Sequence, residues 1–222
     1  GAESLDGGTG NNTVSYSSSA AGVTVNLATM SVSGGDAAGD TIANFIGVQG
    51  SSAGANMLTG SAGMNWIYGG AGNDTLDGGA GGDLLRGEGG VDLLTYANSD
   101  AGVTVNLGTG SATGGHATGD TIYDIENLTG SAYADNLTGS SASNTLTGGN
   151  GDDTINGGAG ADSLDGGTGN DTLSYAGSSA GVNVNIATNT VSGGDAAGDV
   201  ITGFEHVIGS DHNDTITGST AA

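Results

Sequence analysis

The chain has 222 residues, with 48 Gly and neither Pro nor Cys, and its formal net charge is −23 because 24 acids accompany a single Lys or Arg. Nucleic acid and anionic membrane surfaces would repel such a chain, no apolar run is long enough for membrane insertion, and the absence of Cys excludes disulfides and thiolate metal sites. Only about 18% of the residues are Leu, Ile, Val or Phe, which by itself is typical of a disordered chain.

A nine-residue repeat runs along the chain and is clearest in two blocks. The first block reads GGAGNDTLD from Gly69, GGAGGDLLR from Gly78 and GEGGVDLLT from Gly87. The second block reads GGNGDDTIN from Gly148, GGAGADSLD from Gly157 and GGTGNDTLS from Gly166. Weaker copies begin at Gly60, Gly130, Gly139 and Gly209. A short fixed period indicates a solenoid.

A second period, close to eighty residues, is marked by Tyr16, Tyr96 and Tyr175. A nearly unchanged 34-residue segment follows each of these tyrosines. We therefore expect one continuous solenoid over residues 1–222, with three modules and three irregular inserted rungs. The modules cover residues 1–86, 87–165 and 166–222, and the inserted rungs cover 16–49, 96–129 and 175–208.

Each repeat can form one turn and one short strand. Six residues rich in Gly, Asn and Asp predict a turn. The other three, such as Thr75-Leu76-Asp77, leave room for one inward side chain because neighbouring strand residues point to opposite faces. Two repeats then close one coil of eighteen residues, and the aliphatic side chains stack along the axis. The insert strands Val23–Leu27 and their copies at Val103 and Val182 are expected to be longer and to widen their rungs.

The turns have the composition of a cation site. Glycines at positions one, two and four allow backbone carbonyls to point at one spot, and the Asp at position six adds a carboxylate. Oxygen ligands of both kinds favour a hard cation, and a flexible site with many ligands favours Ca²⁺ over Mg²⁺. Several Ca²⁺ ions are therefore the expected cofactor.

The pattern GGxGxDxUx, with U a large aliphatic residue, resembles the nonapeptide of the RTX (repeats-in-toxin, haemolysin-type) calcium-binding family. The resemblance implies an all-β fold, a right-handed parallel β-roll or β-solenoid built from nonapeptide repeats, with Ca²⁺ bound in the turns. Successive turns then lie on opposite edges, and each ion lies between turns two repeats apart.

The family pattern also implies specific ligands. Asp74 would share an ion with Asp92, and Asp153 with Asp171, while Asp83 and Asp162 would serve the opposite edge. Backbone carbonyls would complete the shells, and the candidates are Gly69, Ala71, Gly78, Ala80, Gly87, Gly90, Gly148, Asn150, Gly157, Ala159, Gly167 and Gly169.

Some turns depart from this pattern and are weaker metal candidates. Position six is Asn12, Asn65 or Asn144 in the weak copies, and an Asn offers one neutral oxygen where Asp offers two charged ones. Asp135 and Asp214 keep the acid in turns that have lost glycines. In the inserts, an additional shared metal site and an ordinary polar turn remain open alternatives for Asp36, Asp40, Asp120, Asp195 and Asp199.

Catalytic motifs are not found in this sequence. His116, His206 and His212 lack metal-site spacing, and no nucleophile recurs with a base. We expect no enzyme activity in this segment, so any catalytic domain lies outside it. Trp66 and Tyr68 could stack on sugar rings or simply pack on one coil edge.

Two functional classes fit these observations. The first is a calcium-binding segment of a larger secreted bacterial protein, disordered without Ca²⁺ and folding outside the cell after type I secretion, as the resemblance implies. The second is a repeat stalk or polysaccharide-binding surface of a cell-surface adhesin or S-layer-type protein. Both predict calcium ions as partners in an extracellular or cell-surface setting, an extracellular polysaccharide as a further candidate, and a monomeric fragment.

Overall fold

The computed structural model describes residues 1–218 and consists of short β-strands with three 3₁₀ turns. The chain forms two compact units, which are described separately. One comprises residues 1–96 and 111–125, and the other comprises residues 97–110 and the chain from residue 126 onward. No helix among the described residues is long and apolar enough to cross a membrane.

The first unit holds most of the N-terminal strands. They are β1 Ser4–Asp6, β2 Thr13–Ser15, β3 Thr24–Asn26, β4 Ser31–Ser33, β5 Thr41–Ala43, β6 Gly47–Gln49, β7 Met57–Ser61, β8 Trp66–Ala71, β9 Thr75–Gly79, β10 Leu84–Gly89, β11 Leu93–Thr95, β13 Ser111–Thr113 and β14 Thr121–Tyr123. The 3₁₀ turns η1 Gly35–Ala37 and η2 Gly115–Ala117 complete this unit.

The second unit is built in the same way. Its strands are β12 Thr104–Asn106, β15 Asn127–Thr129, β16 Asn136–Thr138, β17 Thr145–Asn150, β18 Thr154–Asn156, β19 Ser163–Thr168, β20 Thr172–Ser174, β21 Asn183–Asn185, β22 Thr190–Ser192, β23 Val200–Thr202, β24 His206–Ile208 and β25 Thr215–Thr217. Its 3₁₀ turn is η3 Gly194–Ala196.

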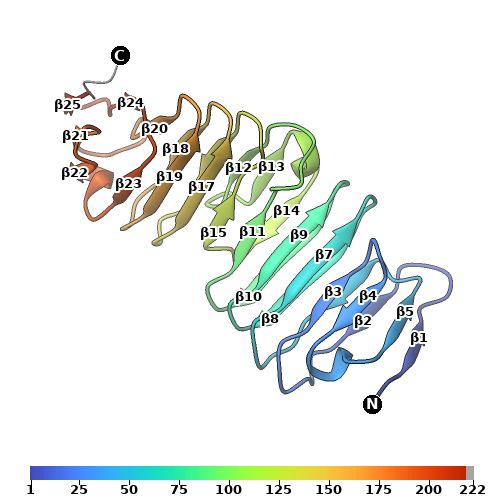
Figure 1. Ribbon diagram of the computed structural model, residues 1–222. Coiled ribbons are helices and arrows are strands. Elements are labelled where there is room, and N and C mark those ends of the chain that lie inside the picture. The colour runs from blue at the N-terminus through green and yellow to red at the C-terminus, as the bar shows by residue number, and fades with distance from the viewer. Residues whose placement is uncertain (219–222) are drawn as a thin grey trace. The chain divides into compact units, whose positions relative to one another are not determined.

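Parallel pairing builds each unit, between strands two repeats apart in the regular rungs and between more distant strands at the inserts (Figure 1). In the first unit β6, β8, β10 and β14 form one ladder, while β3, β7, β9 and β11 form another. In the second unit β16, β18, β20 and β24 pair in order, as do β15, β17, β19 and β23. Leu58 pairs with Leu76, and Leu146 with Leu164, so the register advances by eighteen residues. The expected all-β, parallel solenoid fold is confirmed.

The core is a stack of single aliphatic side chains, one from each rung. The position-eight side chains are at most 1% exposed, and they are Leu58, Ile67, Leu76, Leu85 and Leu94 in the first unit and Leu137, Leu146, Ile155, Leu164 and Leu173 in the second. Burying each such side chain stabilises the fold by about 1.5–3 kcal/mol. On the outer face, the half-buried Trp66 and Tyr68 of β8 pair in register with Leu84 and Arg86 of β10.

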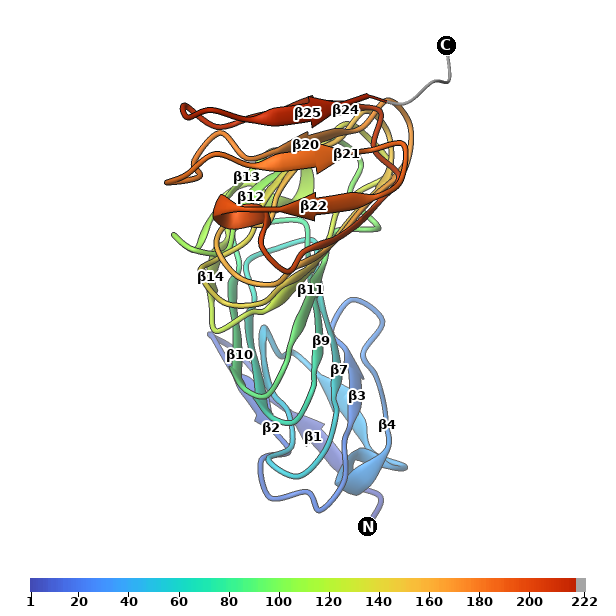
Figure 2. The ribbon, with the colours of Figure 1, turned by 90° about the vertical axis from the view of Figure 1, so that its left-hand side faces the viewer.

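The inserts fold differently from the wide rungs expected from their sequence. Within the first insert, β3 pairs in parallel with β7 and turns back as the antiparallel strand β4, after which β5 pairs with β1 and β6 with β2. The third insert repeats this arrangement with the antiparallel pair β21–β22 (Figure 2). The strand predicted over Val23–Leu27 covers only Thr24–Asn26, because the flanking residues enter turns, although Val23, Val25 and Leu27 are all buried.

Candidate metal centre

The position-six carboxylates of the regular turns form rows in which each Oδ1 atom accepts a backbone N–H from two repeats earlier; they are Asp74, Asp83, Asp92, Asp153, Asp162 and Asp171. In the first unit the Asp74 amide donates to Asp92 Oδ1 at 2.8 Å. In the second unit the Asp153 amide donates to Asp171 Oδ1 at 2.9 Å. The structure therefore brings together the two pairs that the sequence pointed to, Asp74 with Asp92 and Asp153 with Asp171.

A second row follows the alternate turns. The Asn65 amide donates to Asp83 Oδ1 at 2.7 Å, and the Asn144 amide donates to Asp162 Oδ1 at 2.8 Å. Asp83 and Asp162 precede β10 and β19, whereas Asp74 and Asp153 precede β9 and β18. Consecutive repeats thus contribute to different rows, as the two-repeat coil requires.

The second oxygen of these carboxylates has a different environment from the first. The Oδ2 atoms of Asp74, Asp83, Asp153, Asp162 and Asp171 are buried and accept no hydrogen bond. Their side chains are at most 2% exposed. Leaving a buried acceptor without a donor costs about 1–3 kcal/mol, and more for a charged group. Such an atom is a natural ligand for a bound cation.

Burial also changes the acidity of these groups. It raises the pKa of Asp83 to about 7 and those of Asp153 and Asp162 to about 6, because the charged form loses its hydration. The carboxylate of Asp120 raises the pKa of Asp83 further. Arg86, the chain's single Lys or Arg residue, lies 4.0 Å from Asp124 and over the ring of Tyr123. A divalent cation in the rows would supply the missing positive charge.

Glycine is needed at the first two positions of these turns for separate reasons. A Cβ on Gly148 would overlap both Asp153 Oδ2 and the Gly166 carbonyl oxygen, so both oxygens face the same space. Gly149 has a φ of +117°, a conformation that residues with a Cβ rarely adopt. The turns that begin with two glycines and carry Asp at position six, at Gly69, Gly78, Gly148, Gly157 and Gly166, are called the glycine turns below.

Several predicted carbonyls face the rows. The carbonyl oxygen of a position-one residue lies beside the position-one glycine of the turn two repeats earlier. The position-six side chain of that earlier turn lies beside the same glycine. This arrangement holds for the carbonyls of Gly69, Gly78, Gly87, Gly148 and Gly157. A ligand role for the carbonyls of Ala71, Ala80, Gly90, Asn150, Ala159, Gly167 and Gly169 stays a prediction. Oxygen donors of both types fit Ca²⁺ better than a soft metal.

The weak copies differ through a serine at position two. Asp135 Oδ2 accepts the Ser131 amide at 2.6 Å, and Asp135 Oδ1 accepts the Ser131 hydroxyl at 2.8 Å. Asn65 and Asn144 accept the amides of Ser61 and Ser140 at 2.6 and 2.7 Å. These turns, at Gly60, Gly130, Gly139 and Gly209, are called the serine turns. Their position-six oxygens are already satisfied by donors from their own turn.

Asp214 and Asn12 also make hydrogen bonds within their own turns. Asp214 Oδ1 accepts the Ser210 hydroxyl at 2.7 Å. Hydrogen bonds from the Val182 amide and from Ser210 hold the pKa of Asp214 below its usual value. Asn12 donates its side-chain amide to the Thr9 and Gly10 carbonyls of its own turn.

Two residues of the rows were missed by sequence reasoning. The Asn56 side-chain nitrogen donates to Asp74 Oδ1 and to the carbonyls of Ser51, Gly54 and Gly69 at 2.8–3.1 Å. Its turn begins at Gly50 and is one residue too long for the nonapeptide pattern. Glu205 Oε2 accepts the Asp171 amide at 2.9 Å. Glu205 could have been found in the sequence because it directly precedes a strand, β24, as the position-six acids do.

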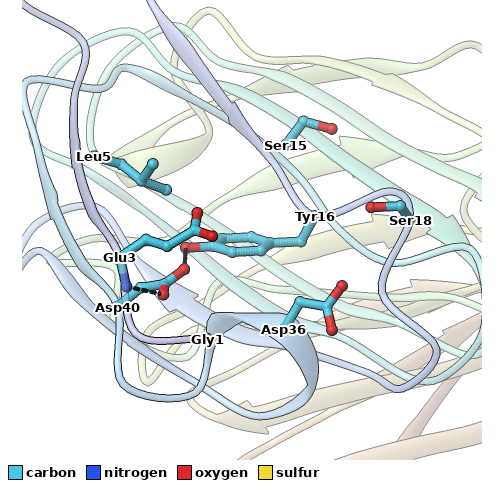
Figure 3. Close-up of a pocket in the computed structure, with 8 residues that line it drawn as sticks. All are labelled: Gly1, Glu3, Leu5, Ser15, Tyr16, Ser18, Asp36 and Asp40. Atoms are coloured by element: carbon cyan, nitrogen blue, oxygen red, sulfur yellow. Dashed lines mark hydrogen bonds between the residues drawn. The ribbon is translucent and has the colours of Figure 1, made fainter.

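The insert acids divide into two groups. Asp120 and Asp199 continue the second row, accepting the amides of Asp83 and Asp162 at 2.8 and 2.9 Å, while Asp40 accepts the Glu3 amide beside the separate β1–β5 pair. Asp36 and Asp195 are the middle residues of η1 and η3, where their amides donate to the hydroxyls of Ser19 and Ser178 at 3.0 Å. Figure 3 shows the cavity around Tyr16, in which Asp40 is bonded to the tyrosine hydroxyl and to the Glu3 amide.

Within residues 1–218, no three or more His, Cys, Asp or Glu side chains are grouped so that they could hold a metal ion. Any site in the rows must therefore combine one or two carboxylates with backbone carbonyls, as the carbonyls facing Asp74 Oδ2 and Asp153 Oδ2 allow.

Comparison with known proteins agrees with this geometry. The model of the RTX calcium-binding nonapeptide repeat matches four segments, residues 1–15, 51–85, 59–94 and 138–173. No curated protein matches the chain. The matched segments include every glycine turn and every carboxylate with an unpartnered Oδ2 atom named above. These four segments therefore match the RTX calcium-binding nonapeptide repeat.

Proposed function

We propose that this chain is a segment of a larger secreted bacterial protein, disordered without Ca²⁺ and folding into a β-roll when it binds Ca²⁺ outside the cell. The observation that carries the proposal is the set of buried Oδ2 atoms named above, which have no hydrogen-bond donor. All of them lie in repeats that match a calcium-binding family. The ligands would be Asp74, Asp83, Asp92, Asp153, Asp162 and Asp171, together with carbonyls of their turns.

The energetics explain why the metal would control folding. Without ions, a net charge of −23 and a thin aliphatic core leave little to offset the entropy of ordering the chain. Each Ca²⁺ ion would add two positive charges between carboxylates that are otherwise buried unpaired. Binding free energy then becomes folding free energy, because the unfolded chain holds no preformed site.

This coupling suits a protein that must leave the cell. A chain that stays unfolded at the low calcium concentration of the cytoplasm can pass a type I secretion channel, and millimolar calcium outside then folds it. Repeats of this family are structural elements, and we assign the segment no reaction of its own. Catalysis would belong to another part of the secreted protein.

Circular dichroism in the far ultraviolet tests the proposal. The chain in chelator should give a coil spectrum, and the addition of about 1–10 mM Ca²⁺ should give a β spectrum. Mg²⁺ at the same concentration serves as the control and should produce much less β structure, because it demands a smaller octahedral site. A β spectrum that persists in chelator would contradict calcium-driven folding.

A further inference from the structure

A tyrosine–aspartate pair recurs in each of the three inserts. The hydroxyl of Tyr96 donates to Asp120 Oδ2 at 2.8 Å, and that of Tyr175 donates to Asp199 Oδ2 at 2.9 Å. The third pair, Tyr16 with Asp40, has a distance of 3.2 Å. All three tyrosines are buried, with at most 4% exposure. The pair is therefore a repeated internal feature and not a chance surface contact.

Two of these aspartates, Asp120 and Asp199, occupy regular places in the second row. Asp120 Oδ1 accepts the Asp83 amide at 2.8 Å, and Asp199 Oδ1 accepts the Asp162 amide at 2.9 Å. The same bond links each regular carboxylate to the turn two repeats earlier. The backbone thus places Asp120 and Asp199 as if they were position-six residues, although the insert sequence departs from the nonapeptide.

The difference between regular and insert aspartates lies in the second oxygen. In Asp83 and Asp162 the Oδ2 atom is buried without a hydrogen-bond donor. In Asp120 and Asp199 the equivalent atom receives the tyrosine hydroxyl. A hydroxyl hydrogen supplies, at that atom, the positive partner that a cation would supply in the regular turns.

We propose that each tyrosine hydroxyl takes the place of a cation beside its aspartate, so that Asp40, Asp120 and Asp199 bind no ion and Tyr96 and Tyr175 close the second row of calcium sites. This inference rests on the proposed function, because it presupposes that the regular turns bind Ca²⁺. Each block of metal-bound rungs then ends at an insert, which is held by hydrogen bonds. The second row then holds no ion at the inserts.

A carboxylate can accept a hydrogen bond and also bind a metal, because ligating carboxylates are commonly hydrogen-bonded. The hydrogen-bond donors around Asp120 and Asp199 argue against that role. Both oxygens of Asp120 and of Asp199 already have a donor, and neither residue has an unpartnered buried oxygen among residues 1–218. The Tyr96 hydroxyl offsets part of the desolvation cost at Asp120, whereas no donor offsets it at the Oδ2 atom of Asp83.

The number of Ca²⁺ ions bound per chain tests this proposal, measured by equilibrium dialysis and atomic emission on the full 222-residue chain. Asp120→Asn should leave the number unchanged, because its remaining oxygen can still accept the Asp83 amide. Asp83→Asn, the matched control in the same row, should lose one ion. Loss of an ion in Asp120→Asn would overturn the proposal.

A second variant keeps the test decisive if Asp120→Asn fails to fold. Tyr96→Phe removes the donor and leaves Asp120 Oδ2 buried and open, as in the regular turns, so it should gain one bound ion. Tyr175→Phe should do the same in the other unit. An unchanged number of bound ions in both folded variants would contradict the proposal that the tyrosine hydroxyls keep Asp120 and Asp199 free of metal. If the unmodified chain binds no Ca²⁺, the proposed function itself fails, which is a separate outcome.

Discussion

Glycine turns and serine turns occupy equivalent places in the rows and differ at position two, where a serine supplies donors and a glycine has a positive φ. Asp135 and Asp153 are both buried and lie in the same row. The Asp135 amide donates to Asp153 Oδ1, and the Asp153 amide donates to Asp171 Oδ1. Asp135 Oδ2 receives the Ser131 amide at 2.6 Å, whereas Asp153 follows Gly149, whose φ is +117°, and its Oδ2 atom has no donor. The residue at position two thus decides whether a buried carboxylate is left for a cation, even though the carboxylate itself is unchanged.

The largest effect is expected from adding one carbon to a glycine turn. Gly148→Ala places a Cβ against Asp153 Oδ2 and the Gly166 carbonyl, which should lower the free energy of unfolding in Ca²⁺ by about 1–3 kcal/mol, the usual cost of overpacking. Urea unfolding followed by circular dichroism measures this change.

Gly63→Ala is the matched control for that substitution. Gly63 lies at position four of a serine turn, and a Cβ there would meet no atom within 4 Å. The change should stay within about 0.5 kcal/mol. Equal destabilisation by the two alanines would show that the carboxylate and the carbonyl beside Gly148 are not the reason why glycine is required there.

A smaller loss is expected from neutralising one carboxylate in a glycine turn. Asp153→Asn should raise the calcium concentration needed for half-maximal folding by about tenfold, equivalent to about 1.4 kcal/mol, because one charged ligand oxygen is lost. The exposed neighbour Asp152 provides the control, since Asp152→Asn removes the same charge next to the row. A calcium titration of the circular dichroism signal compares them, and equal shifts would reduce the effect to general electrostatics.

The comparison can also be reversed by turning a serine turn into a glycine turn. Ser131→Gly with Tyr133→Gly makes residues 130–135 read GGAGAD, identical to residues 157–162. We expect one additional bound Ca²⁺ ion, because the Asp135 carboxylate loses its serine donors. Ser140→Gly with Ala142→Gly is the control, where Asn144 offers no charge and no ion should be gained. Failure of the first variant to gain an ion would refute the role given to position two.

The smallest predicted effect concerns pH in the metal-free chain. Burial raises the pKa of Asp83 to about 7 and those of Asp153 and Asp162 to about 6, against 3.8 for an unperturbed carboxyl. Because the folded form holds these protons more tightly, their contribution to stability is full below about pH 3.8 and is lost as the pH rises through about 6 to 7.

In chelator, the chain should therefore show more β structure at about pH 5 than at about pH 8. Calcium affinity should change in the opposite direction, because protons compete for the same oxygens. Circular dichroism with parallel light scattering measures the first effect and detects precipitation near the isoelectric point of about 4.1. Equal spectra at both pH values would contradict it.

The regular rungs could be predicted from the sequence because their information is local. A nine-residue period fixes which aliphatic side chain points inward, and two repeats per coil place Asp74 beside Asp92. The inserts could not be predicted in the same way. Their strands pair with partners 34 or 37 residues away, as Val48 does with Val14 and Ile42 with Leu5, and no short period encodes that register.

The roles of individual polar residues were also only partly visible. Gly-Ser in place of Gly-Gly is a readable signal, but its meaning depends on where the serine amide points. Asn56 escaped the pattern because its turn has one extra residue, and its amide reaches Asp74 only through the fold. The Tyr96–Asp120 pair joins residues 24 positions apart, which the repeat alone does not connect.

The most direct test of the account is a crystal structure grown in Ca²⁺, with anomalous difference density used to locate the ions. We predict density beside the Oδ2 atoms of the glycine-turn aspartates, which are Asp74, Asp83, Asp153, Asp162 and Asp171. No density is expected beside Asp135 or Asn144, where serine donors fill the same place. Ions at the serine turns, or glycine turns that hold no ion in saturating calcium, would contradict the account.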